Sequence, residues 1–183
     1  MKKIVFLIAF MISANVSMAQ TKVGDVTLPN TVTLSGEEMD LNGAGMREKM
    51  WIDLYAGGLY VQSKSSDAAL LINADAPMAI KLHIVSGMVS QSKMVGAVTD
   101  GFEKSTIGKA TTSDKATFIA CFNDEITKED VFDIVYAGGK TTVYKNGKEK
   151  GSVDGLEFKK ALFGIWLGKN PADKDLKKGM LGK

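Results

Sequence analysis

The chain has 183 residues, of which 23 are lysine or arginine and 21 are aspartate or glutamate, giving a formal net charge of +2. That charge comes entirely from Lys2 and Lys3, so residues 20–183 are formally neutral and a general nucleic-acid-binding surface is excluded. With one cysteine, Cys121, and one histidine, His83, an internal disulfide is excluded, and neither a Cys/His or Ser/His catalytic pair nor a metal site is indicated. We expect Cys121 to be a small buried side chain, and we predict no cofactor.

Residues 1–19 have the pattern of a secretory signal peptide. Lys2 and Lys3 precede an apolar run over residues 4–12, and Ser17-Met18-Ala19 supplies a cleavage site of small residues. The apolar run is shorter than the ~20 residues that a membrane-spanning helix needs. We therefore expect residues 20–183 to form one domain that works in the periplasm or outside the cell, with a retained signal anchor as the alternative.

The first third of this domain indicates β-structure. Residues 25–34 alternate around Pro29-Asn30, which predicts two short strands and a turn at a sheet edge. Residues 50–61 predict a long central strand that is apolar on both faces. Gly57-Gly58 interrupts this strand, and we interpret the pair as a β-bulge, the alternative being the close approach of another backbone or a ligand.

The middle of the domain changes to helical periodicity. A helix capped by Ser65 or Ser66 is predicted to run to residue 73, and a strand is predicted over residues 78–85. Residues 90–105 predict an amphipathic helix whose apolar face includes Met94, Val98 and Phe102. A second helix is predicted from Ser113, as its cap, to residue 122.

The last third predicts three strands followed by two helices. Residues 131–136, 141–144 and 148–153 form the strands, and Asn146-Gly147 is a strong signal for a type I′ hairpin turn. Asp154 and Glu157 predict a capping box for a helix that ends at Gly168, and residues 171–181 predict a short terminal helix. Together the elements predict an α+β domain with helices packed on an antiparallel sheet.

Arg47 is the only arginine in the chain. A guanidinium is planar and can donate two parallel hydrogen bonds to a carboxylate or enolate oxygen, which a lysine ammonium cannot. Arg47 also follows Gly43-Ala44-Gly45, where small residues leave room beside the backbone. We expect a buried anion site here, and the alternative is a structural arginine that holds an internal carboxylate or backbone carbonyls.

The chain resembles the bacterial, chalcone isomerase-like branch of the chalcone isomerase superfamily. Four segments carry the resemblance: residues 41–47, from Leu41 through Gly43-Ala44-Gly45 to Arg47; residues 51–61, from Trp51 to Val61; residues 101–104, Gly101-Phe102-Glu103-Lys104; and residues 161–168, which contain Phe163-Gly164-Ile165-Trp166. The resemblance covers nearly the whole domain, and the segments follow the same order. The resemblance implies an open-faced β-sandwich, with a large antiparallel sheet and helices packed on one face.

The resemblance also bears on catalysis. In the plant isomerases of this superfamily, which close a chalcone to a flavanone, an arginine that matches Arg47 steadies the substrate oxyanion. Their catalytic threonine aligns with Tyr55, and their active-site tyrosine, asparagine and second threonine align with Met94, Gly101 and Ile165. The polar network that positions a phenolate is therefore missing, and we predict no catalytic residues.

Arg47 followed by Tyr55 on the next strand is similar to the fatty-acid-binding members, in which such a pair receives a carboxylate. The implied cleft for the apolar tail is lined by Met94, Val98, Phe102, Leu162 and Ile165, although each of these residues could simply be core. The leading hypothesis is an exported, non-catalytic binder of a small apolar ligand with an acidic group. The alternatives are an intramolecular lyase or isomerase of the chalcone type, and an envelope protein-interaction domain in which Arg47 is structural.

Overall fold

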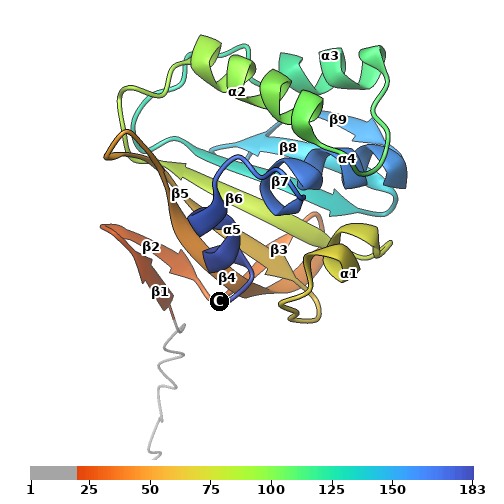
Figure 1. The fold of residues 1–183 in the computed structure, drawn as a ribbon, viewed down its shortest axis with the longest axis horizontal. Helices are drawn as coiled ribbons and strands as arrows, with labels where there is room; N and C mark the ends of the chain where they lie inside the picture. Colours follow the sequence, from red (N-terminus) through yellow and green to blue (C-terminus); the bar gives the residue numbers. More distant parts are fainter. Residues whose placement is uncertain (1–19) are drawn as a thin grey trace, which may run out of the picture.

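The structure, a computed structural model, describes residues 20–183, so the predicted signal peptide lies outside the described residues. Its centre is a seven-stranded antiparallel sheet in which every strand pairs with the next one along the chain (Figure 1). In sheet order the strands are β3 (Thr31–Leu34), β4 (Glu37–Lys49), β5 (Ile52–Val61), β6 (Met78–Ile84), β7 (Val131–Ala137), β8 (Lys140–Lys145) and β9 (Lys148–Asp154). The meander predicted for the last three strands therefore extends through the whole sheet.

The helices lie on one face of this sheet (Figure 1). They are α1 (Ala68–Asn73), α2 (Gln91–Lys104), α3 (Thr112–Ala120), α4 (Leu156–Leu167) and α5 (Lys174–Met180). Helix α4 is buried over most of its surface because α1, α2, α5 and strand β8 all contact it. None of the helices in residues 20–183 has the length and apolar character needed to cross a membrane.

Two apolar layers stabilise the domain. The larger one fills the space between the sheet and the helices, and it includes Phe102 and Phe118, whose rings meet edge to face with centroids 6.0 Å apart. The smaller one lies on the opposite face, where a separate hairpin of β1 (Gln20–Val23) and β2 (Val26–Pro29) packs Leu28 near Tyr60. The predicted fold class, α+β with helices on one face of a large antiparallel sheet, is confirmed.

Strand β5 is central and buried, as predicted, but the interpretation of Gly57-Gly58 as a bulge is wrong. Both glycines keep regular pairing with β4 and β6, and the irregularities in the β4–β5 register lie between Leu41 and Gly43 and between Arg47 and Glu48. A β-carbon on Gly57 would lie 2.8 Å from the Met180 side chain of α5. The glycine is required because a terminal helix packs directly on the strand.

The predicted helix starts are partly correct. Ser90 caps α2 by accepting a hydrogen bond from the backbone N–H of Lys93. Three other predicted caps are wrong. Asp67, and neither Ser65 nor Ser66, caps α1; α3 begins two residues earlier than predicted, with a capping box formed by Thr111 and Asp114; and α4 has Gly155 at its N-cap with no side-chain bond. Asp154 cannot cap α4 because it is the last residue of β9, where it pairs with Lys140.

Candidate functional site

Arg47 and Tyr55 lie directly opposite each other on neighbouring strands. The antiparallel register of β4 and β5 pairs these two residues, so both side chains leave the same face of the sheet. That face is the one covered by helices, because Arg47 contacts the α4–α5 connection and Tyr55 contacts α4. The structure therefore brings together the two polar residues that the sequence singled out.

Tyr55 is buried with its hydroxyl in a polar contact. The hydroxyl oxygen accepts a hydrogen bond from the indole Nε1 of Trp166 at 3.1 Å, and only 8% of the residue is exposed. Burial raises the pKa of Tyr55, while the nearby Arg47 charge acts in the opposite direction, so the phenol stays neutral and keeps its hydrogen. Within residues 20–183 that hydrogen has no acceptor, which leaves Tyr55 able to donate to an anion.

Arg47 is held by the segment that joins α4 to α5. Its guanidinium donates to the backbone carbonyl of Ala172, and its Nη1 lies 3.7 Å from a carboxylate oxygen of Asp173. The Arg47 and Asp173 side chains are 18% and 17% exposed, so the pair is largely shielded from water. Asp173 is also the N-cap of α5, accepting from the backbone N–H groups of Asp175 and Leu176 at 2.8 and 2.9 Å. These contacts match the structural alternative for Arg47, and they also link the guanidinium to the position of α5.

The five predicted apolar ligand contacts are all buried between the helices and the sheet. Met94, Val98 and Phe102 come from one face of α2 and Leu162 and Ile165 from α4, and all five are buried in the same core cluster as Tyr55. The two helices approach closely where Gly101 faces Ile165. The predicted binding role of these residues and of Arg47 and Tyr55 stays a prediction.

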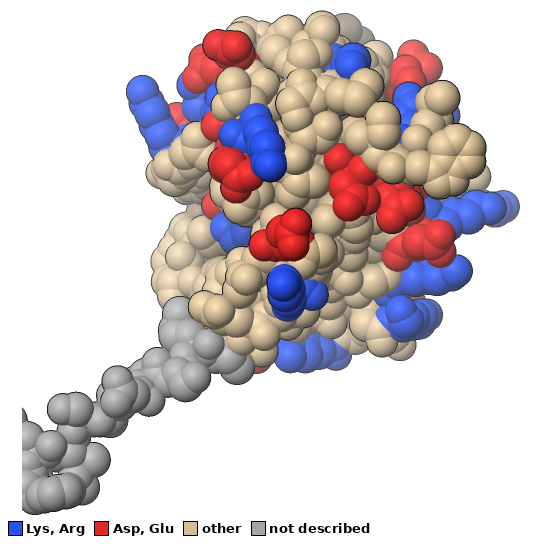
Figure 2. Space-filling model, turned by 90° about the vertical axis from the view of Figure 1, so that its left-hand side faces the viewer, with Lys and Arg blue, Asp and Glu red and all other residues tan. Residues whose placement is uncertain are grey.

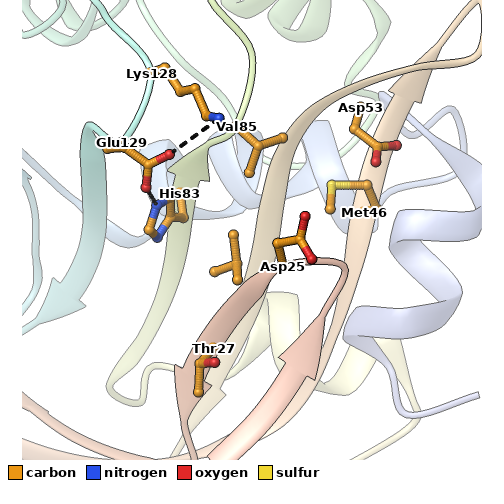
Figure 3. Close-up of a pocket in the computed structure, with 9 residues that line it drawn as sticks. Asp25, Thr27, Met46, Asp53, His83, Val85, Lys128 and Glu129 are labelled. Atoms are coloured by element: carbon orange, nitrogen blue, oxygen red, sulfur yellow. Dashed lines mark hydrogen bonds and ion pairs between the residues drawn. The ribbon is translucent and has the colours of Figure 1, made fainter.

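Two surface hollows of about 260 Å³ each lie within residues 20–183, and neither is lined by these seven residues. Figure 3 shows the first, which lies on the opposite face of the sheet from Arg47 because Met46 lines it. His83 and Glu129 are hydrogen bonded at 3.0 Å on one side, with Asp25 and Asp53 across the hollow. The bond to His83 lowers the pKa of Glu129. This ionic, open hollow does not suit an apolar ligand.

Cys121 and His83, the two residues considered for nucleophile or metal chemistry, lie on opposite faces of the sheet. Cys121 is buried at 2% exposure beside Gly151, which confirms the prediction of a small buried side chain, and burial raises the pKa of its thiol. It lies in the core beneath the helices, whereas His83 lines the hollow on the other face. Within residues 20–183, no three His, Cys, Asp or Glu side chains are grouped as a metal ion would require.

Two residues of the candidate site, Trp166 and Asp173, were not predicted from the sequence. Trp166 was interpreted only as an apolar residue of the predicted helix and as part of the family resemblance, whereas its indole N–H donates to the Tyr55 hydroxyl. Asp173 directly precedes α5, and an aspartate at that position could have been recognised as a helix N-cap. Its second contact, with Arg47, gave no signal in the sequence.

Comparison with known proteins bears out the resemblance. The model of a family described as chalcone isomerase-like matches residues 20–182. Among solved structures, a fatty-acid binding protein of Arabidopsis thaliana is similar, with a TM-score of 0.65 and 20% sequence identity over 86% of this chain and 92% of that chain. No curated protein sequence matches the chain. At this identity the structural likeness shows the fold, and a bacterial origin stays a prediction.

Proposed function

This chain belongs to the chalcone isomerase-like family, and we propose that it binds a small apolar molecule with an acidic group, such as a fatty acid, without catalysing a reaction. The observation that carries the proposal is the pairing of Arg47 with Tyr55 on the helix-covered face of the sheet. Together they offer a fixed positive charge and an unused hydroxyl donor at one place. A carboxylate can use both.

The tail of such a ligand would lie between α2, α4 and the sheet. Met94, Val98 and Phe102 on α2 and Leu162 and Ile165 on α4 are the contacts that we propose. Burial of the tail stabilises the complex by about 0.8 kcal/mol for each CH₂ group removed from water. Because these side chains are packed against one another, the ligand must separate α2 or α5 from the sheet as it enters.

Binding also requires an exchange of partners at Arg47. The ligand carboxylate takes the place of the Ala172 carbonyl and the Asp173 carboxylate, both of which belong to the connection into α5. Helix α5 rests on strand glycines, with the Leu176 and Met180 side chains in the space beside Gly57. A shift of this short helix would open that space to an acyl chain.

The geometry does not favour ring closure of a chalcone. Gly101 faces Ile165 so closely that a β-carbon would lie 2.6 Å from the isoleucine, and Met94 is buried in the apolar core. Three of the four positions that carry polar groups in the isomerases, Met94, Gly101 and Ile165, are therefore packed and apolar. Turnover of a chalcone to a flavanone that depends on Arg47, followed by absorbance, would favour the isomerase instead.

We further propose that the domain works after export, in the periplasm or outside the cell. The support is the signal-peptide pattern of residues 1–19. Mass measurement of the protein purified from cells that express the full chain tests this directly, since cleavage after Ala19 leaves Gln20 as the first residue. A protein that keeps all 183 residues and stays in the cytoplasm contradicts the proposal.

The binding proposal is tested with two ligands of equal length, dodecanoate and dodecan-1-ol, which differ only in the acidic group. Native mass spectrometry and calorimetry should show dodecanoate bound at a ratio of one to one. Replacing Arg47 by Gln removes charge-assisted hydrogen bonds and should weaken dodecanoate about 10- to 100-fold, leaving dodecan-1-ol unchanged. Arg47→Lys keeps the charge without the planar guanidinium, so its affinity for dodecanoate should lie between those of the wild type and Arg47→Gln.

Two results would contradict the proposal. If the wild-type protein binds neither compound, ligand capture is excluded, and a stable protein partner would then favour the envelope-interaction alternative. If Arg47→Gln weakens both compounds equally, Arg47 acts only by holding α5 in place. Circular dichroism of each variant establishes that it is folded before its affinity is compared.

A further inference from the structure

Four β-hairpins of the main sheet turn through two residues with positive φ, and one of them is unlike the others. The φ values at the two turn residues are 51° and 81° for Ser35-Gly36, 51° and 62° for Met50-Trp51, 57° and 76° for Gly138-Gly139, and 50° and 77° for Asn146-Gly147. Such turns favour glycine and asparagine because a β-carbon is crowded in the left-handed region. Only the β4–β5 turn uses two large apolar side chains, at a cost in backbone energy.

The same turn is the most exposed apolar part of the described domain. Trp51 is 95% exposed and Met50 is 76% exposed, and Ile52, the first residue of β5, is 36% exposed. The β6–α2 loop adds Met88, which is 50% exposed, and its Val85 N–H donates to the Leu54 carbonyl beside the turn. These four exposed side chains, Met50, Trp51, Ile52 and Met88, form what we call the hairpin tip. Side chains this exposed bury little apolar surface, so they contribute little to the stability of the fold.

The charges around the hairpin tip are mixed. Glu48 and Lys49 precede the turn and Asp53 follows it, all three exposed, so the tip carries no concentration of either sign. Figure 2 shows this end of the molecule, where basic and acidic side chains are interspersed among uncharged surface. A partner attracted by charge, such as nucleic acid or a strongly anionic surface, is not indicated.

The size and shape of the hairpin tip decide what can cover it. Four side chains of this kind present on the order of 500 Å² at most, whereas a stable protein interface buries about 800 Å² on each partner. A convex turn also offers no groove to a rigid partner. A lipid surface deforms around an inserted group, and tryptophan prefers the boundary between the acyl chains and the headgroups.

We propose that the hairpin tip docks this protein on the surface of a lipid bilayer, with Trp51 and Met50 inserted at the level of the headgroups. The inference does not rest on the proposed function, because it uses neither Arg47 nor Tyr55. The two fit together, since the same hairpin carries Arg47 and Tyr55 at the base of the inserted turn. Docking would bring the candidate site to a surface rich in acyl chains.

The chain offers a direct optical readout of docking. It has two tryptophans, and Trp166 is 4% exposed and hydrogen bonded, so a change in emission on adding vesicles reports Trp51. The protein is purified from cells that express the full chain, its mass establishes whether residues 1–19 remain, and every variant is compared in that same form. Phosphatidylcholine vesicles should shift the emission to shorter wavelength and should sediment the protein, equally in 0.05 M and 0.5 M salt, since insertion is apolar.

Two variants of the hairpin tip and one control variant separate docking from a structural role. Trp51→Ala should weaken partition into the vesicles at least tenfold, whereas Leu70→Ala, at an exposed apolar residue on α1, should not change it. The double variant Met50→Asn with Trp51→Gly restores the preferred turn residues. It should unfold at a higher temperature than the wild type and should no longer sediment with vesicles.

Several outcomes overturn the inference. One is an emission spectrum that vesicles leave unchanged, and another is binding that disappears in 0.5 M salt, which would indicate adsorption through charge. A double variant that is less stable than the wild type shows that Met50 and Trp51 serve the fold. Dimerisation in analytical ultracentrifugation that Trp51→Ala abolishes shows that a second copy of the chain covers the tip.

Discussion

The carboxylate of Asp173 lies 3.7 Å from the guanidinium of Arg47, at the point where the chain enters its last helix. One oxygen of Asp173 caps α5 while the other faces Arg47, so a single side chain couples the only arginine to the helix that covers β4 and β5. Under the proposed function, this carboxylate occupies the position that a ligand carboxylate would take. Asp173 then competes with the ligand for Arg47.

Replacing Asp173 by Asn tests this competition. Asparagine caps helices as well as aspartate does, so α5 keeps its N-terminal hydrogen bonds while the competing charge is removed. A partly exposed ion pair contributes up to about 1 kcal/mol, so dodecanoate should bind about two- to fivefold more tightly, with dodecan-1-ol unchanged, in calorimetry. Asp175→Asn is the matched control, because Asp175 is 87% exposed and pairs only with Lys178. Unchanged or weaker binding of dodecanoate by Asp173→Asn contradicts the competition.

A comparison with a second buried tyrosine, Tyr60, separates the role of the Tyr55 hydroxyl in ligand binding from its role in stability. Tyr55→Phe removes the acceptor of the Trp166 indole, and Tyr60→Phe removes a donor to the Pro29 carbonyl on the other face of the sheet. Each variant should lose about 1 kcal/mol of unfolding free energy in urea denaturation. Only Tyr55→Phe should also weaken dodecanoate, by about threefold to tenfold. An equal effect of both variants on affinity would mean that stability, and no direct contact, explains the loss.

Local signals were enough to predict most of the elements. The 3.6-residue pattern of Met94, Val98 and Phe102 and the Asn146-Gly147 turn predicted α2 and the β8–β9 hairpin because both depend on neighbours in sequence. The bulge at Gly57-Gly58 was a wrong interpretation because the reason for these glycines is Met180, in a distant helix. A glycine in a strand indicates that something lies close, and the sequence does not say what.

The sequence predicted that Arg47 and Tyr55 belong to one site, but it did not predict the residues that hydrogen bond to each of them. The short turn alone would pair Arg47 with Leu54, and the register shift between Arg47 and Glu48 places Tyr55 opposite Arg47 instead. The partners of this pair come from far along the chain: Ala172 is 125 residues from Arg47, and Trp166 is 111 residues from Tyr55. Such contacts depend on how α4 and α5 pack on the sheet. No local pattern encodes that packing.

A buried lysine provides a test of the α1–α4 contact. Lys159 is fully buried, and its ammonium donates to the carbonyls of Leu71, Ile72 and Ala74, which close the C-terminal end of α1, at 2.8 to 2.9 Å. Burial lowers the pKa of Lys159 to about 8, so the charged form still predominates at pH 7. Lys159→Met leaves three carbonyls without their donor and should cost about 3 kcal/mol or more in urea denaturation. Lys160→Met, which loses only an ion pair with the exposed Glu157, should cost less than about 1 kcal/mol.

Two glycines of α2 should respond in opposite directions to the same substitution. A β-carbon on Gly101 would lie 2.6 Å from the Ile165 side chain, so Gly101→Ala forces α2 away from α4 and should lower the free energy of unfolding by about 1 to 3 kcal/mol. A β-carbon on Gly96 would meet no neighbouring atom within 4 Å. Gly96→Ala should therefore raise the free energy of unfolding by up to about 1 kcal/mol, because alanine favours the helix. Urea denaturation of both variants compares them directly. Equal changes in the two variants would mean that α2 and α4 do not meet at Gly101 and Ile165, and the proposed lining of the cleft would then be wrong.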